Sequence, residues 1–302
     1  MKHLLKLSDL TTEEIFSILD LADQLKYERK NGIPHPHLAG KSIGLIFEKS
    51  STRTRVSFET GIYQLGGQPI FLSSRDLQIG RGEPVQDTAR VLSRYLDGIM
   101  IRTFEQQEVE DLAKYGSIPI INGLTDYCHP CQVLADLMTI REKFATLEGI
   151  KLAYIGDGNN MTNSLMVGGL KTGMKVSVAC PEGYMPDADL LAWAKQNPNF
   201  EITNDPRVAV AGADVVYTDT WASMGQESEK EARIKAFQGY QVNDELMALA
   251  SEKAIVQHCL PAYRGQEITD EVFEAHADAL FDEAENRLHA QKAVMVMLMK
   301  DH

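Results

Sequence analysis

The segment at residues 51–55, Ser-Thr-Arg-Thr-Arg, concentrates hydroxyl and guanidinium groups in one short stretch. An apolar run at 42–47 before it predicts a buried strand, and an amphipathic run at 56–65 after it predicts a helix. A helix N-terminus offers N–H groups and the positive end of a dipole, and arginine adds bidentate bonds to an anion. A lone Ser or Thr here would only cap the helix. Two arginines between hydroxyls favour an anion site, above all for phosphate.

Other polar side chains follow the predicted strands farther along the chain. In a parallel α/β sheet, ligands bind beyond the carboxyl ends of the strands. Five strand ends carry such residues: Arg102, residues 129–132, residues 157–160, Asp219 and residues 258–261. Taken singly, Arg102 could be a surface ion-pair partner and His129 a core or capping histidine. Five ends of this kind in one chain indicate a ligand site.

Arg102 and His129, together with the turn at 51–55, would form a cationic pocket rich in hydrogen-bond donors. Such a pocket can polarise a carbonyl group next to a phosphate and stabilise an oxyanion. Covalent acyl catalysis is not indicated, because the chain has no Gly-x-Ser-x-Gly elbow and no ordered Ser, His and Asp set. Cys259 follows His258 directly, so the two side chains are expected to point apart, and Cys259 is interpreted as a polar contact to a second substrate.

Cofactor motifs are incomplete in this sequence. Gly156-Asp-Gly158 follows a predicted strand, but position 161 is Met, so the dinucleotide fingerprint fails. There is no Walker A motif, and no Asp or Glu cluster has metal-ligand spacing. The sequence therefore predicts no NAD, no ATP, no metal and no other cofactor.

Composition bounds the class of protein. The 302 residues carry a net charge of −13, which argues against nucleic acid or an anionic membrane as a partner. The first residues lack the apolar core of a signal peptide, and no run has transmembrane length, so a cytoplasmic protein is expected. Cys128 and Cys131 have the spacing of a redox motif or of half a zinc site. The other two cysteines, Cys180 and Cys259, are isolated, so no second pair exists.

Short apolar runs alternate with helical patterns, which is typical of parallel α/β sheets. Thr11 and Glu14 have capping-box spacing, which predicts a helix to about residue 29. The predicted strands are residues 42–47, 69–72, 98–101, 118–121, 151–155, 175–179, 214–217 and 254–257. The sequence therefore predicts two doubly wound α/β domains with parallel sheets and an active site in the cleft between them.

The expected domain boundaries follow from the two series of strands. They are residues 1–131 with 285–302 for the first domain, 132–148 for a linking helix, and 149–284 for the second domain. The last helical pattern, from about residue 284, would pack back on the first domain. Polar segments at 73–88 and 219–243 are expected to be binding loops or lids.

Five motifs, in order along nearly the whole chain, resemble those of the ornithine carbamoyltransferases. They are residues 47–55, His129-Pro-Cys-Gln132, Asp157-Gly-Asn-Asn160, the segment from Asp219 to Ser223-Met-Gly225, and His258-Cys-Leu-Pro261. The first two motifs mark the wider aspartate/ornithine carbamoyltransferase superfamily. The Ser-Met-Gly loop and His-Cys-Leu-Pro indicate ornithine rather than aspartate, putrescine or N-acetylornithine.

The resemblance implies carbamoyl phosphate as one substrate and assigns residues to each part of it. Its phosphate would be held by Ser51, Thr52, Arg53 and Thr54. Its carbonyl would be polarised by Arg102, His129 and Thr54. Its amide would be held by Gln132 and the backbone carbonyl of Leu260. Further contacts would come from Arg287, from Cys259 and, out of a neighbouring subunit of a homotrimer, from Gln78.

The resemblance implies L-ornithine as the second substrate. Its α-amino and α-carboxylate groups would be bound by Asn160, Ser223 and Met224, and its δ-amine would be oriented by Asp219 and Cys259. The neutral amine would attack the carbamoyl carbon directly, and a tetrahedral oxyanion would release phosphate and L-citrulline. Closure of the 219–243 segment would exclude water. The enzyme would serve arginine metabolism, in either direction, as a homotrimer or an assembly of trimers.

Three alternatives remain open from the sequence. One is a carbamoyltransferase with another amine acceptor. Another is a non-catalytic, ligand-binding relative, which should have lost Arg53, Arg102 or His129, although all three are present. The third is a redox protein that uses Cys128 and Cys131.

Overall fold

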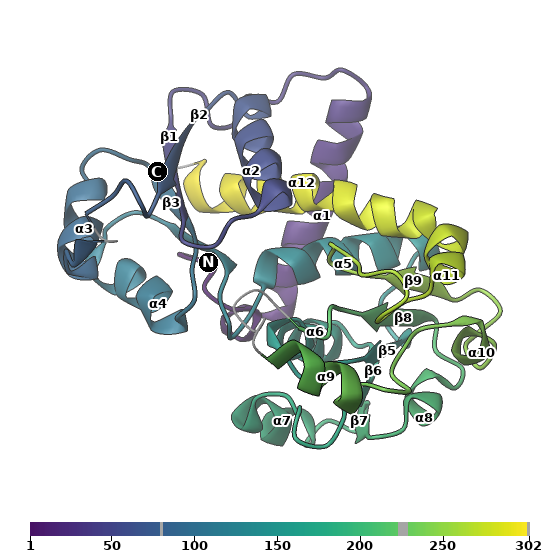
Figure 1. The fold of residues 1–302 in the computed structure, drawn as a ribbon. Coiled ribbons are helices and arrows are strands. Elements are labelled where there is room, and N and C mark those ends of the chain that lie inside the picture. The colour runs from purple at the N-terminus through teal and green to yellow at the C-terminus, as the bar shows by residue number, and fades with distance from the viewer. Residues whose placement is uncertain (79–80, 223–228, 301–302) are drawn as a thin grey trace. The chain divides into compact units, whose positions relative to one another are not determined.

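The computed structural model describes residues 1–78, 81–222 and 229–300, and it divides into two compact units (Figure 1). Unit 1 consists of Met1–Met138 and Glu285–His302, and unit 2 consists of Thr139–Ala284. The chain leaves unit 1, forms unit 2 in one continuous stretch and then returns to unit 1.

Unit 1 contains a four-stranded parallel sheet with the strand order β2-β1-β3-β4. The strands are β1 (Ser42–Phe47), β2 (Gln68–Ser73), β3 (Gly98–Arg102) and β4 (Ile120–Leu124). The helices are η1 (Leu7–Asp9), α1 (Thr12–Lys30), α2 (Thr52–Gln64), α3 (Val85–Leu92) and α4 (Gln106–Tyr115). Helix α5 (Pro130–Phe144) begins in unit 1, and α12 (Ala277–Met299) ends in it.

Strand β1 lies inside this sheet because its sequence is apolar on both faces. Residues 43–47 are all buried, as expected for a parallel strand covered on both sides. The chain leaves β1 toward β2 on one side and leaves β3 toward β4 on the other. The loops after β1 and β3 therefore diverge, so a ligand crevice is expected at the carboxyl ends of these two strands.

Unit 2 contains a five-stranded parallel sheet with the strand order β7-β6-β5-β8-β9. The strands are β5 (Lys151–Ile155), β6 (Lys175–Ala179), β7 (Phe200–Thr203), β8 (Val215–Thr218) and β9 (Ile255–Gln257). The helices are α6 (Asn160–Lys171), α7 (Ala188–Ala194), α8 (Pro206–Val210), α9 (Lys230–Ala236), α10 (Asp244–Met247) and α11 (Asp270–Ala275). Here the strand order reverses between β5 and β8, so a second crevice is expected at their carboxyl ends.

The prediction of two doubly wound domains with parallel sheets is confirmed. All eight predicted strands are present, with ends shifted by a few residues. Strand β7 was not predicted, because its Phe-Glu-Ile-Thr sequence is short, partly polar and at the sheet edge. Helix α9 occupies part of the 219–243 segment that was expected to be a loop. Among the residues that the structure describes, no helix combines the length and apolar character needed to cross a membrane.

Candidate active site

The Ser-Thr-Arg-Thr-Arg segment lies between strand and helix as predicted, but α2 begins at Thr52 rather than at residue 56, so the segment forms the first turn of the helix. Ser51 is the N-cap residue, and its hydroxyl accepts a hydrogen bond from the N–H of Thr54 at 3.1 Å. Thr54 is buried, Arg53 is half-buried and Thr52 is exposed. Capping satisfies only one of the N–H groups that a helix start leaves without an intrahelical partner. Residues 51–54 are hereafter called the phosphate turn. The N–H groups that are not capped, together with the positive end of the helix dipole, are the features that bind anions.

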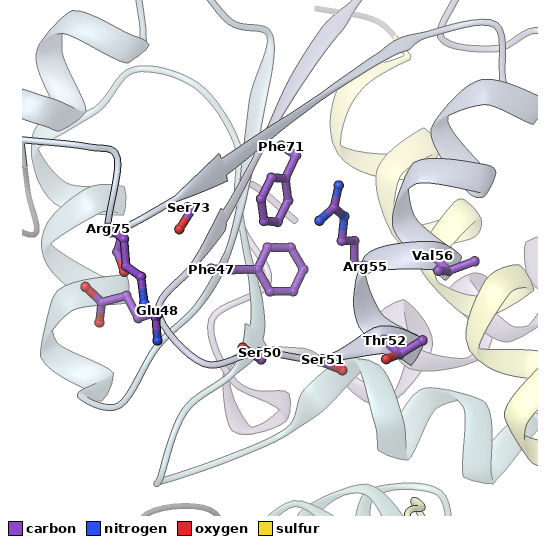
Figure 2. A pocket seen from close by; sticks show the side chains of 11 residues that line it. Phe47, Glu48, Ser50, Ser51, Thr52, Arg55, Val56, Phe71, Ser73 and Arg75 are labelled. Atoms are coloured by element: carbon purple, nitrogen blue, oxygen red, sulfur yellow. The ribbon is translucent and has the colours of Figure 1, made fainter.

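A pocket of about 310 Å³ lies beside the phosphate turn within unit 1 (Figure 2). Its lining includes Ser51 and Thr52 as well as the aromatic ring of Phe71. The guanidinium of Arg55 lies 3.6 Å from the centre of the Phe71 ring, and its Nε donates to Glu59 at 3.0 Å. Arg55 is thus part of the pocket wall. It is one of the two arginines that suggested an anion site, but the family resemblance assigns it no substrate contact.

Arg287 joins two other predicted site residues, Thr54 and Gln132, within unit 1. It is 3% exposed, and its Nη2 donates to Thr54 Oγ1 at 3.1 Å while its Nη1 donates to Gln132 Oε1 at 2.7 Å. Thr54 belongs to α2, Gln132 to α5 and Arg287 to α12, so segments far apart in sequence meet at one guanidinium group. The structure therefore places a cation, a hydroxyl and an amide together at the phosphate turn.

Two further side chains orient this group, and the sequence analysis missed both. Gln132 Nε2 donates to Asp136 Oδ1 at 2.8 Å, which fixes which end of the Gln132 amide faces Arg287. Gln291 Oε1 accepts from Nε and Nη2 of Arg287 at 3.1 and 2.9 Å. Each partner lies four residues along the same helix, a spacing at which helical side chains meet. That spacing makes both residues candidates in the sequence, although it does not show which neighbour each amide faces.

Arg102 and His129 are both buried in unit 1, at 6% and 4% exposed. Arg102 is the last residue of β3, and His129 directly precedes α5. Burial, followed by the charges of Arg287 and Arg102, holds the pKa of His129 well below its usual value. His129 is therefore neutral at pH 7, with one ring N–H that can donate to an oxygen. This state suits a group that polarises a carbonyl beside two cations.

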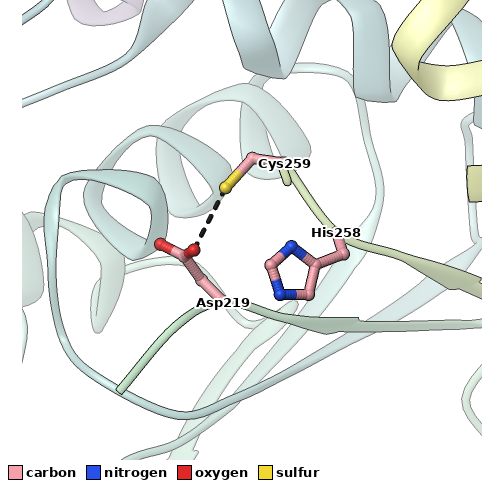
Figure 3. A group of neighbouring side chains, drawn as sticks. All are labelled: Asp219, His258 and Cys259. Atoms are coloured by element: carbon pink, nitrogen blue, oxygen red, sulfur yellow. Dashed lines mark hydrogen bonds between the residues drawn. The ribbon is translucent and has the colours of Figure 1, made fainter. Parts of the chain in front are cut away.

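Asp219 is the organising residue at the carboxyl end of β8 in unit 2. Its Oδ1 accepts from the thiol of Cys259 at 3.1 Å, and its Oδ2 accepts from Asn159 Nδ2 at 2.8 Å (Figure 3). Asn159 also caps α6, because its Oδ1 accepts from the N–H groups of Met161 and Thr162. The half-buried Asn160 beside it is the first residue of α6.

A metal could be sought among Asp219, His258 and Cys259, whose ligand atoms lie within 4.8 Å of one another. Both ring nitrogens of His258 are already in use, however. Nδ1 accepts from the N–H of Leu260 at 2.9 Å, and Nε2 lies 3.1 Å from Glu267 Oε1. This arrangement leaves two ligands in the cluster, fewer than the three protein ligands of a typical catalytic zinc site. Leu260, whose N–H donates to His258, has a φ of 56°. A non-glycine residue in this left-handed region is strained, and such residues are more frequent at binding sites.

Asp157, in the predicted Asp-Gly-Asn-Asn motif, forms a buried ion pair that the sequence analysis missed. Arg233 Nη1 donates to Asp157 Oδ2 at 2.8 Å and to the carbonyl of Trp221 at 3.1 Å. Burial raises the pKa of Asp157 to about 6, although Arg233 opposes this effect. Gly158 has a steric reason for being glycine, because a Cβ there would lie 2.2 Å from the backbone of Met185. The loop between β5 and α6 therefore packs directly against the backbone of residues 185–186.

The redox alternative for Cys128 and Cys131 does not fit their surroundings. Both cysteines are buried and form no disulfide. Burial raises the pKa of each thiol to about 12, so neither is a thiolate at neutral pH. A redox cysteine needs a lowered pKa and access to its partner. Their contacts are instead structural, for example from Cys131 Sγ to the carbonyl of Asn122 at 3.4 Å.

For Ser223, Met224 and Gln78 the expected substrate contacts stay predictions. Ser223 and Met224, together with the rest of the Ser-Met-Gly segment, lie outside the described residues. Gln78 is exposed in the loop after β2, and its backbone carbonyl accepts from the N–H groups of Arg81 and Glu83 at 2.8 and 3.1 Å. Its side chain faces solvent on the isolated chain.

Comparison with known proteins matches both units to one family. Residues 2–142 match the carbamoyl-P binding domain of aspartate/ornithine carbamoyltransferase, and residues 148–298 match the Asp/Orn binding domain. The chain is 58% identical over 305 residues to the ornithine carbamoyltransferase of Oceanobacillus iheyensis, covering 99% of this chain and 95% of that protein. It is 55% identical over 303 residues to that of Thermococcus kodakarensis, covering 99% and 96%.

Solved structures give the same result. The ornithine carbamoyltransferase from Pyrococcus furiosus superimposes with a TM-score of 0.94 at 52% identity, covering 99% of this chain and 97% of that one. The anabolic ornithine carbamoyltransferase from Campylobacter jejuni has a TM-score of 0.94 at 43% identity, covering 100% of both chains.

Proposed function

The chain belongs to the aspartate/ornithine carbamoyltransferase family, and we propose that it transfers the carbamoyl group of carbamoyl phosphate to the δ-amine of L-ornithine, giving L-citrulline and phosphate. The observation that carries the proposal is the hydrogen bonding of Arg287 to Thr54 and Gln132. It links the phosphate turn to the amide expected to hold the carbamoyl group. Full-length relatives named ornithine carbamoyltransferase, at 54 to 58% identity, support ornithine as the acceptor.

Unit 1 supplies the carbamoyl phosphate contacts in this proposal. The phosphate is held by Ser51, Thr52, Arg53 and Thr54 at the start of α2, with Arg287 behind them. Arg102 and the neutral His129 act on the carbonyl oxygen, where negative charge develops in the tetrahedral intermediate. A neutral histidine donates one hydrogen bond without adding a third positive charge beside Arg102 and Arg287. Gln132 binds the amide end of the substrate.

Unit 2 supplies the acceptor contacts. Asp219, with both carboxylate oxygens already oriented, attracts and aligns the δ-amine, and Cys259 completes this contact. The Leu260 carbonyl and Cys259 are assigned to the carbamoyl amide. Asn160, with Ser223 and Met224, is assigned to the α-amino and α-carboxylate groups of ornithine.

The proposed reaction needs no covalent enzyme intermediate. The lone pair of the neutral δ-amine forms a C–N bond to the carbamoyl carbon, and the carbonyl electrons move to oxygen. When the carbonyl re-forms, the C–O bond to phosphate breaks and the phosphate takes up the amine proton. The chain contributes fixed positive groups and N–H donors for the oxyanion, and alignment of the two substrates. The position of the active site between the two domains stays a prediction.

Citrulline formation from carbamoyl phosphate and L-ornithine tests the proposal, with putrescine, N-acetyl-L-ornithine and L-aspartate assayed in parallel. We expect turnover of ornithine alone, and loss of that turnover in Arg53→Ala. Arg207→Ala, at an exposed arginine of unit 2, is the matched control and should keep full activity. Turnover of a different amine would reject the acceptor assignment but keep the carbamoyl phosphate site. Binding of carbamoyl phosphate without turnover of any amine would indicate a non-catalytic relative.

The proposed assembly is a homotrimer, or a larger assembly of trimers, in which Gln78 completes the site of a neighbouring subunit. Two features of unit 1 support an interface at this edge. Gln78 is exposed, and β2 is an edge strand on which Ile70 and Phe71 are 36% and 37% exposed. Tyr63 on the adjacent α2 is 78% exposed. Apolar side chains along an open strand edge favour association with another chain.

Light scattering during gel filtration tests the assembly, and a trimer would have three times the 33.6 kDa mass of the chain. Complementation tests the role of Gln78. Subunits of Gln78→Ala and Arg53→Ala should each be nearly inactive alone. Mixed trimers should regain activity, because some sites then combine an intact Arg53 with an intact Gln78 from the neighbour. No recovery in verified mixed trimers would reject the shared site.

A further inference from the structure

Gln291 is a fully buried residue of α12 that contacts both Arg287 and helix α2. Its Oε1 accepts from Nε of Arg287 at 3.1 Å and from Nη2 at 2.9 Å. Its Nε2 donates to the hydroxyl of Ser57 at 2.7 Å. Ser57 Oγ in turn donates to the backbone carbonyl of Thr54 at 3.3 Å. The hydrogen bond from Arg287 Nη2 to Thr54 Oγ1 closes a ring of four residues, hereafter the α2–α12 ring.

We propose that Gln291 is a positioning residue for carbamoyl phosphate binding, which acts by fixing the plane of the Arg287 guanidinium. The inference rests on the proposed function, because it assumes that the phosphate turn binds this substrate. Gln291 makes no contact with the phosphate turn itself in the bonds described above. It acts through Arg287 on one side and through Ser57 on the other.

The geometry of Arg287 requires such a partner. A guanidinium group is planar, and its hydrogen bonds here involve all three of its nitrogen atoms. One oxygen of Gln291 bridges Nε and Nη2, which sets the rotation of the group about its stem. With that rotation fixed, Nη1 faces Gln132 and Nη2 faces Thr54. Without it, the guanidinium could turn away from either residue.

The ring also determines where the hydroxyl proton of Thr54 can point. Arginine can only donate, so Thr54 Oγ1 is the acceptor in its bond to Arg287. The hydroxyl proton of Thr54 must therefore point elsewhere and can be donated to a phosphate oxygen. The amide of Gln291 is oriented in the same way, because its oxygen faces Arg287 and its NH₂ group faces Ser57. The ring therefore presents Thr54 as a donor before the substrate binds.

Holding α12 against α2 does not require Gln291. The next residue, Lys292, donates to Gln64 of α2 at 3.1 Å and lies 2.7 Å from His35 Nε2. Gln291 is buried, where an apolar side chain of similar size would pack without needing hydrogen-bond partners. Substitutions at Gln291 therefore test the positioning of Arg287, whereas substitutions at Gln64 test the packing of α12 against α2. Gln64 is a matched control, because it is also a glutamine that bonds between α2 and α12.

The test measures the Kd for carbamoyl phosphate by calorimetry, and steady-state kinetics, in Gln291→Leu, Gln291→Glu, Ser57→Ala and Gln64→Leu. We expect Gln291→Leu to raise the Kd about tenfold, with the KM for ornithine at saturating carbamoyl phosphate changed less than about twofold. Gln291→Glu keeps acceptors for Arg287 and should restore most of the affinity. As a single substitution, Ser57→Ala should also raise the Kd. In the double variant with Gln291→Leu it should raise the Kd no further, because both residues act through the same ring.

Thermal unfolding of each variant shows whether it is folded. Gln64→Leu should lower the Tm and leave the Kd for carbamoyl phosphate unchanged. An unchanged Kd in Gln291→Leu, or an equal increase in Gln64→Leu, would overturn the inference while leaving the proposed function intact. Absence of carbamoyl phosphate binding by the unmodified enzyme would overturn the proposed function and this inference with it. Should Gln291→Leu fail to fold, the other two variants test the inference. A raised Kd in Ser57→Ala with an unchanged Kd in Gln64→Leu supports it, and equal Kd values in the two variants reject it.

Discussion

The thiol of Cys259 is hydrogen-bonded to the carboxylate of Asp219, with Sγ 3.1 Å from Oδ1. Asn159 Nδ2 holds the other carboxylate oxygen at 2.8 Å. Both oxygens are therefore oriented by the chain before any ligand arrives. The pair thus presents an oriented carboxylate to an incoming amine.

Substitutions at Cys259 should separate hydrogen bonding from reactivity. Cys259→Ser keeps a donor to Asp219 and should lower kcat/KM for ornithine by no more than about fivefold. Cys259→Val removes the donor at similar size and should lower it by about tenfold or more, because a buried carboxylate oxygen loses a partner. Asp219→Asn should lower it by about a hundredfold or more. Steady-state kinetics at saturating carbamoyl phosphate measures all three, and equal losses in the serine and valine variants would contradict the pairing.

Alkylation should distinguish Cys259 from the other three cysteines. Cys128, Cys131 and Cys180 are buried, and burial raises the pKa of each thiol, to about 12 for Cys128 and Cys131. Cys259 is half-buried. Iodoacetamide at pH 7.5 should therefore modify Cys259 alone, and ornithine with carbamoyl phosphate should slow the reaction. Peptide mass spectrometry locates the label, with protein unfolded in urea as the control in which all four react. Rapid labelling of Cys128 in folded protein would disagree with its burial.

The depressed pKa of His129 predicts a specific dependence of stability on pH. Unfolded histidine titrates near 6.5, whereas folded His129 titrates well below that value. Between the two values the unfolded state binds the extra proton, so the free energy of unfolding decreases as the pH falls below about 6.5. Above that pH, His129 does not change the free energy of unfolding as the pH varies. His129→Gln should remove a slope of at most about 1.4 kcal/mol per pH unit.

Urea unfolding at pH 7.5, 6.5 and 5.5 measures this slope. His3, His37 and His276 also have lowered pKa values, from burial, and they remain in both proteins. The difference between the two stability curves therefore isolates His129. Parallel curves over this range would show that His129 is protonated as readily in the folded state as in the unfolded chain.

The buried pair of Asp157 and Arg233 should also give a pH-dependent effect. The folded pKa of Asp157 is about 6, above the ordinary 3.8, so its contribution to stability is greatest below the lower value and is lost as the pH rises through the higher one. Arg233 opposes this loss by stabilising the carboxylate. Arg233→Met should therefore raise the pKa of Asp157 further. It should lower the free energy of unfolding by about 3 kcal/mol at pH 7.5 and by less at pH 5.

Denaturant unfolding at these two pH values checks the effect of Arg233→Met. The matched control is Arg264→Met, which breaks an exposed pair of Arg264 with Asp270 and should show no comparable dependence on pH. An equal destabilisation at both pH values would mean that Arg233 acts through packing rather than through the charge of Asp157.

The strand framework and the strand-end residues could be predicted from sequence because they depend on local pattern. A parallel strand covered on both faces is a continuous apolar run, as in β1 and β5, and the residue after it lies at the ligand edge of the sheet. The capping box at Thr11 and Glu14 is likewise local, and both of its hydrogen bonds are present. Strand β7 was missed because an edge strand need not be apolar.

Side chains that meet across segments could not be predicted in this way. Arg233 reaches Asp157 from 76 positions along the chain, and no local pattern distinguishes it from the other arginines of the chain. Asp136 and Gln291 have the right helical spacing, but spacing does not reveal which neighbour a buried amide faces. Asn159 and Asn160 are adjacent and chemically identical, and the sequence does not show that Asn159 is the one that caps α6 and donates to Asp219.

The return of the chain to unit 1 through α12 has a consequence for the order of events during synthesis. Thr54 and Gln132 leave the ribosome early, but the whole of unit 2, residues 139–284, must be translated before Arg287 exists. A nascent chain that has completed the first sheet still lacks the guanidinium that joins these two side chains. Chaperones and proteases therefore encounter a first unit whose buried group is incomplete, and under the proposed function carbamoyl phosphate can bind only after unit 2 has been synthesised.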